Sequence, residues 1–232
     1  MDKEKTKQIW MHANLPVVPF VCIRRREYNN EEERMQIIKN VGRDFNFPVF
    51  VKPCCAGSSV GATKAKDAVA LLSSLKEAFE WDDKVLIEPF IEAREIECSV
   101  TGNEEVTAYT PGEIVPSHDF YDYEAKYTDP NGAALLIPAE LDDADLLKVR
   151  ETAKKAYQAL DLTGLSRVDF FIDKKSGKFY LNEVNTIPGF TSISMFAKMC
   201  EASGLHYAQL IETLINLAVE RAKNRQNLKT SR

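Results

Sequence analysis

The segment that restricts the fold most is residues 166–185, where two short apolar stretches flank a turn. The stretches are SRVDFFID and KFYLNEVN, and the KKSG between them combines turn-forming residues with a glycine. A three-residue loop at 175–177, with Gly177 in the left-handed conformation, would pair the strands so that Asp169 lies opposite Glu183. The sequence therefore predicts an antiparallel hairpin that holds two carboxylates side by side.

The end of this hairpin has the composition of a metal site. Because strand side chains alternate between faces, Glu183 and Asn185 are expected to share a face with Leu181, opposite Tyr180, Asn182 and Val184. Two adjacent carboxylates repel each other unless a cation lies between them. Asp169, Glu183 and Asn185 form an all-oxygen set that suits magnesium, which takes further ligands from water and phosphates. An exposed hairpin edge with solvated acids is the alternative interpretation of the same spacing.

Composition excludes several classes of function. The 232 residues are 44% hydrophobic, enough for one large core or two small ones, and the net charge of -5 with no basic stripe beyond Arg24–Arg26 argues against nucleic acid. No apolar run approaches the roughly 18 residues of a membrane span, and the N-terminus does not resemble a signal peptide. Five cysteines without a C-x-x-C pair indicate reduced thiols rather than a zinc site. The cytoplasm is the expected compartment.

The order of elements predicts two α+β units. The first contains expected helices near 3–13, 30–41 and 66–80 and strands at 17–23, 49–52 and 84–90. The second is β-rich at 95–102 and 105–115, continues through a polar, aromatic stretch at 117–137 that is predicted to be a functional loop, and ends in helices. These helices are expected near 144–160, 192–202 and 207–222, and the first has an apolar face at Val149, Ala153, Ala156, Tyr157 and Leu160. The predicted units are residues 1–91 and 92–232.

A glycine-containing loop after the strand at 49–52 is a candidate phosphate site. In FVKPCCAGSSVGATKA, Lys52 ends the strand, and Gly57 and Gly61 bound a loop in which Ser58 adds a hydroxyl donor. Glycines allow the backbone to turn its N–H groups toward an anion. The spacing matches neither a Walker A loop nor a dinucleotide fingerprint. An ordinary tight hairpin fits these residues equally well.

Two further stretches suggest a nucleotide site. In VLIEPFIEAREIE, a strand leads into a linker, and the apolar walls and free backbone groups near Ile91 suit an adenine. A carboxylate such as Glu95 suits ribose hydroxyls. A plain domain linker is the alternative interpretation. In FYDYEAKYT, Lys126 lies among aromatic residues that are expected to close over a ligand. A loop that only packs on the surface is the alternative there.

Taken together, the motifs are far more specific than any one of them. KPCCAGSSVG, VLIEPFI, YDYEAKY, RVDFF and NEVNTIPGFTSIS, in this order, resemble the D-alanine–D-alanine ligase family of ATP-grasp enzymes, over nearly all of the chain. The resemblance implies an ATP-grasp fold whose central subdomain is residues 1–91 and whose C-terminal subdomain is residues 92–232, with the nucleotide between them. It implies cytoplasmic synthesis of a peptidoglycan precursor, in which ATP phosphorylates one D-alanine and the amine of a second attacks the acyl phosphate.

The resemblance also implies a role for each matching position. Metal ligands for two magnesium ions, with manganese as a substitute, are implied at Asp169, Glu183 and Asn185, with Glu183 bridging. Nucleotide contacts are implied at Lys3, Lys52, Ser58, Glu88, Ile91 and Glu95. Catalytic groups are implied at Arg167, the Gly189 backbone and Lys126, and the second D-alanine carboxylate is implied at Ser194 and Met195.

One departure from the family pattern limits these implications. Family members carry an additional N-terminal domain that holds the amine of the first D-alanine, and nothing in this sequence matches it. The chain is therefore expected to be weak or inactive alone, with that domain missing or separate. The loop around Lys126 favours D-alanine over D-lactate as second substrate, and a homodimer is compatible with the family. Another ATP-dependent carboxylate–amine ligase and a non-catalytic nucleotide-binding module remain the alternatives.

Overall fold

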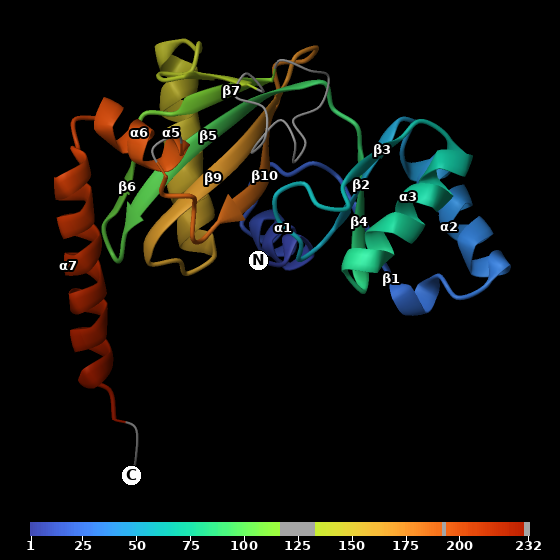
Figure 1. The fold of residues 1–232 in the computed structure, drawn as a ribbon, viewed down its shortest axis with the longest axis horizontal. Coiled ribbons are helices and arrows are strands. Elements are labelled where there is room, and N and C mark those ends of the chain that lie inside the picture. Colours follow the sequence, from blue (N-terminus) through green and yellow to red (C-terminus); the bar gives the residue numbers. More distant parts are fainter. Residues whose placement is uncertain (117–132, 192–193, 230–232) are drawn as a thin grey trace.

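Two antiparallel sheets form the framework of the protein in the computed structural model, which describes residues 1–116, 133–191 and 194–229 (Figure 1). The smaller sheet has the strand order β1-β4-β2-β3, and the larger has β10-β9-β5-β7-β8 with β6 beside β5. The predicted α+β class is confirmed by this arrangement.

The small sheet is covered on one face by two helices (Figure 1). Its strands are β1 (Val21–Arg24), β2 (Val49–Pro53), β3 (Thr63–Ala65) and β4 (Lys84–Pro89), and the 3-10 turn η1 spans Arg25–Glu27. The helices are α2 (Glu31–Asp44) and α3 (Ala68–Trp81), capped at their N-termini by the side chains of Asn30 and Asp67. Leu71, Leu75 and Ala78 of α3 are fully buried, as helical spacing requires of a core-facing stripe.

The large sheet lies between helices. Its strands are β5 (Ala93–Gly102), β6 (Val106–Ala108), β7 (Gly112–Pro116), β8 (Ala133–Leu136), β9 (Gly164–Asp173) and β10 (Phe179–Asn185), and its helices are α5 (Asp143–Ala159), α6 (Met195–Ala202) and α7 (Tyr207–Gln226). The face predicted for α5 is confirmed, because Val149, Ala153, Ala156 and Tyr157 are fully buried in the main core. On the opposite face, Ser99 Oγ donates to the Phe196 carbonyl of α6 at 3.0 Å. Among the helices that the structure describes, none combines the length and apolar composition that a bilayer crossing requires.

The predicted hairpin forms with the predicted carboxylate pair but with a different loop. Asp169 lies opposite Glu183, and Gly177 has a φ of 67°. The amide of Asp173 donates to the carbonyl of Lys178, so the loop contains residues 174–177 rather than three residues. A β-bulge between Leu181 and Glu183 adds the compensating residue and restores the register at Asp169.

Because of the bulge, the predicted distribution of side chains between the two faces of β10 is wrong. Leu181 and Val184 are both buried in the main core, so Leu181 does not share a face with Glu183 as simple alternation predicts. The physical reason is that one extra residue shifts the alternation by one position. Asn182 and Glu183 consequently both face the cavity described below.

The expectation of a single loop over 117–137 is wrong at its end. Residues Ala133–Leu136 form β8, which pairs with β7 from Glu113↔Leu136 to Pro116↔Ala133. A four-residue strand is too short to show a clear period in the sequence.

Helix α1 (Lys3–His12) connects the two sheets (Figure 1). Trp10 is fully buried in the core of the large sheet, where its Nε1 donates to the carbonyl of Ala156 at 2.9 Å. The first turn instead contacts the small sheet, because Glu4 pairs with Lys84 of β4 at 2.8 Å. The side chain of Asp2 caps the helix and also pairs with Lys84.

We expect these ion pairs at Lys84 to make stability depend on pH. Burial, the largest single cause, raises the pKa of Asp2 and of Glu4, but the hydrogen bond and charge of Lys84, together with backbone amides at Asp2 and Arg24 at Glu4, hold both pKa values below their ordinary values. A lowered carboxyl pKa stabilises the fold above the unfolded pKa of about 4, and this contribution is lost as pH falls through the folded value. Lys84→Met should therefore lower the melting temperature at pH 7 by more than at pH 3, followed by circular dichroism.

The matched control is Lys76→Met, which removes an exposed lysine of α3. It should leave the melting temperature nearly unchanged at both pH values. An equal loss at pH 7 and pH 3 in Lys84→Met would show that the pairing with Asp2 and Glu4 is unimportant.

Candidate active site

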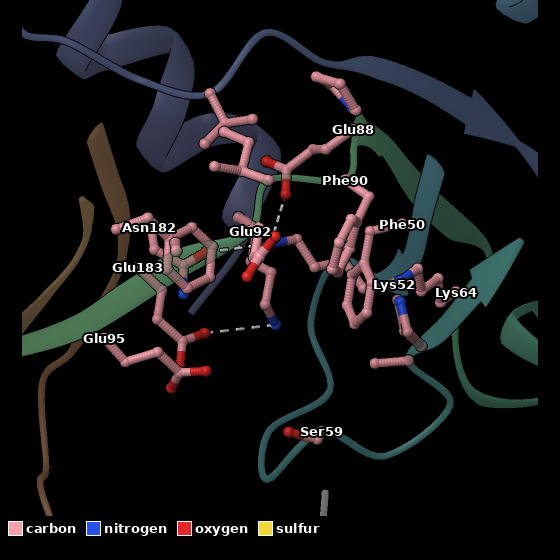
Figure 2. Close-up of a pocket in the computed structure, with 18 of the residues that line it drawn as sticks. Phe50, Lys52, Ser59, Lys64, Glu88, Phe90, Glu92, Glu95, Asn182 and Glu183 are labelled. Carbon is pink, nitrogen blue, oxygen red and sulfur yellow. Dashed lines mark hydrogen bonds and ion pairs between the residues drawn. The ribbon is translucent and has the colours of Figure 1, made fainter. Parts of the chain in front are cut away.

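A cavity of about 750 Å³ lies where the two sheets meet (Figure 2). Its wall comes from β2, the loop after β2, β4, the start of β5 and β10. Seven residues singled out in the sequence line it together: Lys3, Lys52, Ser58, Glu88, Ile91, Glu95 and Glu183. The fold thus collects polar groups from distant parts of the chain into one space.

The loop at residues 54–62 is not a tight hairpin. Ser58, Ser59 and Gly61 have φ values of 52°, 59° and 66°, a left-handed run that turns backbone N–H groups away from a sheet ladder. A side chain at Gly61 would place its Cβ 2.5 Å from Trp81 Cδ1, so glycine is required there. Lys3 Nζ donates to the carbonyl of Ala56 at 2.6 Å and ties the loop to α1. The tight-hairpin alternative is therefore excluded.

A buried ion cluster lies beneath the cavity. Lys52 Nζ is 2.6 Å from Glu88 Oε2, and Lys7 Nζ is 2.7 Å from Glu88 Oε1. Burial alone would raise the pKa of Glu88, but the charges of Lys52 and Lys7 outweigh it and lower that pKa. Burial is the largest cause of the lowered pKa of Lys7, opposed by Glu88. Glu88 is thus held as a carboxylate in the cavity wall.

Aromatic rings form the apolar side of the cavity. Phe50 and Phe90 lie beside the stem of Lys52 (Figure 2), and Phe171 also lines the space. Lys64 Nζ lies 3.5 Å from the centroid of the Phe90 ring, a cation–π contact. Flat apolar walls next to a carboxylate and lysines suit a ligand with a planar ring and anionic groups.

Three carboxylates occupy neighbouring positions across β5, β9 and β10. Glu97 lies opposite Asp169, which lies opposite Glu183, so all three are on one face. Arg167 binds both oxygens of Asp169 at 2.7 Å and lies 3.1 Å from Glu97. Burial alone would lower the pKa of Arg167, but Asp169 and Glu97 outweigh it and raise it. This guanidinium therefore offsets part of the negative charge of the row, through Asp169 and Glu97.

The side chains at the hairpin end can be tested for their fit to a metal ion. Asp169, Glu183 and Asn185 offer only oxygen ligands, which suits a hard cation. However, Asn185 Nδ2 also donates to Asp169 Oδ2 at 2.9 Å, and Glu183 lies 3.8 Å from Lys3 Nζ. Within the described residues, no group of three or more His, Cys, Asp or Glu is arranged to hold a metal ion. The oxygens at the hairpin end are engaged in this structure, those of Asp169 by Arg167 and Asn185 and those of Glu183 by Lys3.

Comparison with known proteins identifies the family. The sequence model described as "D-ala D-ala ligase C-terminus" matches residues 9–216. The chain belongs to the D-alanine–D-alanine ligase family. The D-alanine–D-alanine ligase of Treponema denticola is 60% identical over the whole chain, and that of Caldicellulosiruptor bescii is 46% identical. The chain spans 63% of the length of each of these relatives.

Solved structures of family members have the same fold. The D-alanine-D-alanine ligase from Coxiella burnetii superposes with a TM-score of 0.81 at 34% identity, covering 97% of this chain and 58% of that one. The VanG D-Ala:D-Ser ligase from Enterococcus faecalis gives 0.80 at 35% identity, covering 94% and 61%. The predictions of the ligase family and of its ATP-grasp fold are confirmed.

Three further candidate residues of this ligase-family chain, Gly189, Ser194 and Met195, follow β10 in the sequence. Gly189 approaches Ser194 so closely that a Cβ would lie 2.9 Å from Ser194 Oγ, which accepts from the Thr191 amide at 3.0 Å. The side chain of Met195 is 4% exposed and packs against Ile114 and Met199. A ligand at the start of α6 would therefore meet the backbone of Met195 rather than its side chain. Lys126 lies outside the described residues.

Lys7 and Glu97 contact candidate site residues, but they were not identified from the sequence. Lys7 lies in a polar helix where a single lysine is unremarkable, and only its position on the face of Lys3, four residues earlier, could have indicated it. Glu97 lies in the strand EIECSVTG, where side chains alternate between the two faces of the sheet. Its pairing with Asp169 follows only from the strand order, which places β5 beside β9.

Proposed function

We propose that this chain supplies the nucleotide-binding and catalytic part of a cytoplasmic, ATP-dependent D-alanine–D-alanine ligase that makes a peptidoglycan precursor. The observation that carries the proposal is the cavity itself, where Lys3, Lys52, the left-handed loop and Glu183 of the hairpin face one space. Membership of the ligase family supports the same function. The proposed subdomains are residues 1–91 and 92–232.

In this proposal each part of the cavity contacts a different part of ATP. Lys3, Lys52 and the loop at Ser58 bind the phosphates, because cations and oriented N–H groups stabilise that charge. Glu88 and the backbone at Ile91 contact the adenine, and Glu95 binds the ribose hydroxyls. Asp169, Glu183 and Asn185 would hold one or two magnesium or manganese ions, which offset the negative charge of the phosphates.

The proposed reaction has two steps. The γ-phosphoryl group moves from ATP to the carboxylate of a first D-alanine, and ADP is the leaving group. The amine of a second D-alanine then attacks the carbonyl carbon, the C–O bond to phosphate breaks, and the amine loses its proton. Arg167 and the Gly189 backbone are proposed to stabilise the oxyanion, Ser194 and the Met195 backbone to hold the second carboxylate, and Lys126 to meet the phosphoryl group.

The choice of amino-acid substrates is proposed to depend also on groups outside the described cavity. The proposed grip on the amine of the first D-alanine belongs to the part of the relatives outside the matched region, and homodimerisation is proposed only as compatible with the family. A related ligase with a different second substrate is the main alternative, since the structure of the VanG D-Ala:D-Ser ligase has nearly the same TM-score. The 60% identity with a D-alanine–D-alanine ligase favours D-alanine.

The first test is binding of magnesium–ATP to the 232-residue chain. Ligand at a hundred times its Kd should add about 2.7 kcal/mol to the free energy of unfolding. Glu183→Gln should weaken the magnesium-dependent part of this gain and largely keep the part seen with ATP and EDTA, because one anionic oxygen ligand is removed. Calorimetry and thermal melts measure both parts.

A carboxylate on the outside of α5 supplies the control. Glu151 is half exposed and pairs with Lys154, so Glu151→Gln should keep the whole magnesium–ATP gain. A folded wild-type chain that gives no heat with magnesium–ATP would exclude both the ligase and a nucleotide-binding module.

A further inference from the structure

The C-terminal end of α3 contacts both ends of the loop at residues 54–62. Trp81 is the last residue of the helix, and Asp82 is its C-cap. Most of the loop lines the cavity, including Ser59, which lies at its edge in Figure 2, whereas Trp81 and Asp82 are not part of the described lining. The helix end therefore touches the loop without facing the ligand space.

The start of the loop is held by the Asp82 carboxylate. Its Oδ2 accepts from the amide of Cys55 at 2.7 Å, and its Oδ1 accepts from the amide of Lys84 at 3.1 Å. The amide of Cys54 also donates to the carbonyl of Lys84, at 2.9 Å. One carboxylate thus joins the first residues of the loop to the first residue of β4.

The end of the loop is held by the ring of Trp81. The ring lies so close to Gly61 that a Cβ there would be 2.5 Å from Trp81 Cδ1 and 3.0 Å from Pro53 Cγ. Trp81 is 59% exposed and does not belong to the buried core of the small sheet. An exposed indole packed on the backbone of a loop is placed to hold that loop rather than to stabilise the core.

The backbone of this loop has a conformation that needs support. Ser58 and Ser59 are left-handed, a conformation that costs free energy for any residue with a side chain. The amide of Val60 donates to the carbonyl of Gly57, and that of Ala62 to the carbonyl of Ser59, but both bonds lie within the loop. A strained backbone persists where its surroundings hold it, and here the helix end supplies that hold.

We propose that Trp81 and Asp82 are positioning residues that keep the loop in the conformation that binds the phosphates of a nucleotide, an inference that rests on the proposed function. Neither side chain touches the ligand. When these contacts are lost, only a fraction of the molecules keeps the binding conformation, and the apparent Kd for a phosphate-bearing ligand rises by the inverse of that fraction. Adenosine carries no phosphate, so its Kd is unaffected.

The first test uses Trp81→Ala in the 232-residue chain, with magnesium–ATP measured by calorimetry and adenosine by its competition with ATP. The Kd of ATP should rise about tenfold, as expected if one molecule in ten keeps the binding conformation, and that of adenosine should stay within about twofold. Trp81→Phe keeps a ring against Gly61 and should recover most of the affinity for ATP. Val69→Ala removes a 77% exposed side chain at the other end of α3 and should change neither Kd.

The second variant is Asp82→Ala, for which charge and position predict opposite results. Loss of a negative charge near an anion site would by itself strengthen ATP binding, so a higher Kd reports the lost contact with the loop. We expect a rise of about tenfold, the size of one hydrogen bond to a charged group. The control is Asp83→Ala, which removes the neighbouring carboxylate, paired with Arg25, and should not raise the Kd.

A double variant tests the contact itself and does not depend on adenosine. Gly61→Ala should raise the Kd of ATP, and it should raise it less in the Trp81→Ala background, where the ring no longer meets the added methyl group. Equal effects in both backgrounds, or equal weakening of ATP and adenosine in Trp81→Ala, would overturn the positioning role and leave the proposed function intact. No ATP binding by the folded wild type would overturn the proposed function and this inference with it.

Discussion

Replacing Arg167 with methionine is expected to lower the free energy of unfolding by about 3–5 kcal/mol, because it leaves two buried carboxylates without their cation. Arg167 binds both oxygens of Asp169 and also contacts Glu97, and these acidic side chains are 12% and 7% exposed. Methionine keeps an unbranched apolar stem but removes the guanidinium, so the loss reports mainly the missing charge and its hydrogen bonds. Urea denaturation monitored by circular dichroism measures it.

Added magnesium should recover part of this loss. Removing the guanidinium takes one positive charge away from the row of Glu97, Asp169 and Glu183, and a divalent cation is the available replacement. Arg167→Met should therefore gain more stability from millimolar magnesium than the wild type does.

Arg94→Met is the control for Arg167→Met. Arg94 binds Glu113 through two hydrogen bonds of 2.7 and 2.5 Å in the same sheet, but it faces one carboxylate rather than two and is 30% exposed. Its replacement should cost less, and magnesium should restore nothing. A loss below about 1 kcal/mol in Arg167→Met, the size of a surface ion pair, would contradict this account of the carboxylate row.

Trp10→Ala is expected to lower the free energy of unfolding by about 3–5 kcal/mol. Trp10 is the largest fully buried side chain, and its removal leaves a cavity in the main core and the Ala156 carbonyl without its donor. Because α1 also carries Lys3 and Lys7, the same change should weaken ATP binding, although Trp10 is far down the helix from the cavity. Urea denaturation and ATP calorimetry test the two effects separately.

Two neighbouring changes separate the contributions of Trp10. Trp10→Phe keeps most of the apolar volume and loses the donor, so it should cost clearly less than Trp10→Ala. Ile9→Ala changes a side chain that is 42% exposed on the same helix and should stay within about 0.5 kcal/mol of the wild type. If Trp10→Ala matched Ile9→Ala, α1 would not depend on the main core for its position.

The sequence predicted the hairpin pairing but not its detailed geometry. Asp169 opposite Glu183 followed from the turn residues, and Gly177 takes the left-handed conformation as expected. The loop is one residue longer than predicted, and the bulge at Asn182 was not predicted. The two differences shift the strand pairing in opposite directions, so Asp169 still lies opposite Glu183. A bulge depends on what packs on each face of the strand, here Leu181 and Val184 in the core, and local sequence does not record that.

Local sequence also limits which of the site residues could be predicted. Lys52 and Glu95 were identified because they lie in recognisable stretches, Lys3 was identified through the family resemblance, and all three line the cavity. Lys7 and Glu97 gain their importance from partners 81 and 72 positions further along the chain, at Glu88 and Asp169. Pairings over such separations are set by strand order, which hydrophobic periodicity does not encode. The assigned roles of these residues in binding stay predictions.

The position of α1 also sets an order of events during synthesis of the chain. Trp10 donates to Ala156, 146 residues away, and the carbonyl of Pro16 accepts from the amide of Leu181. The small sheet can form once residue 89 has left the ribosome, because its strands and covering helices lie within residues 21–89. Residues 10–16 must instead wait until about residue 181 for their partners. The apolar side chain of Trp10 therefore stays exposed while the 146 residues up to Ala156 are made, a stage at which chaperone binding or aggregation competes with folding.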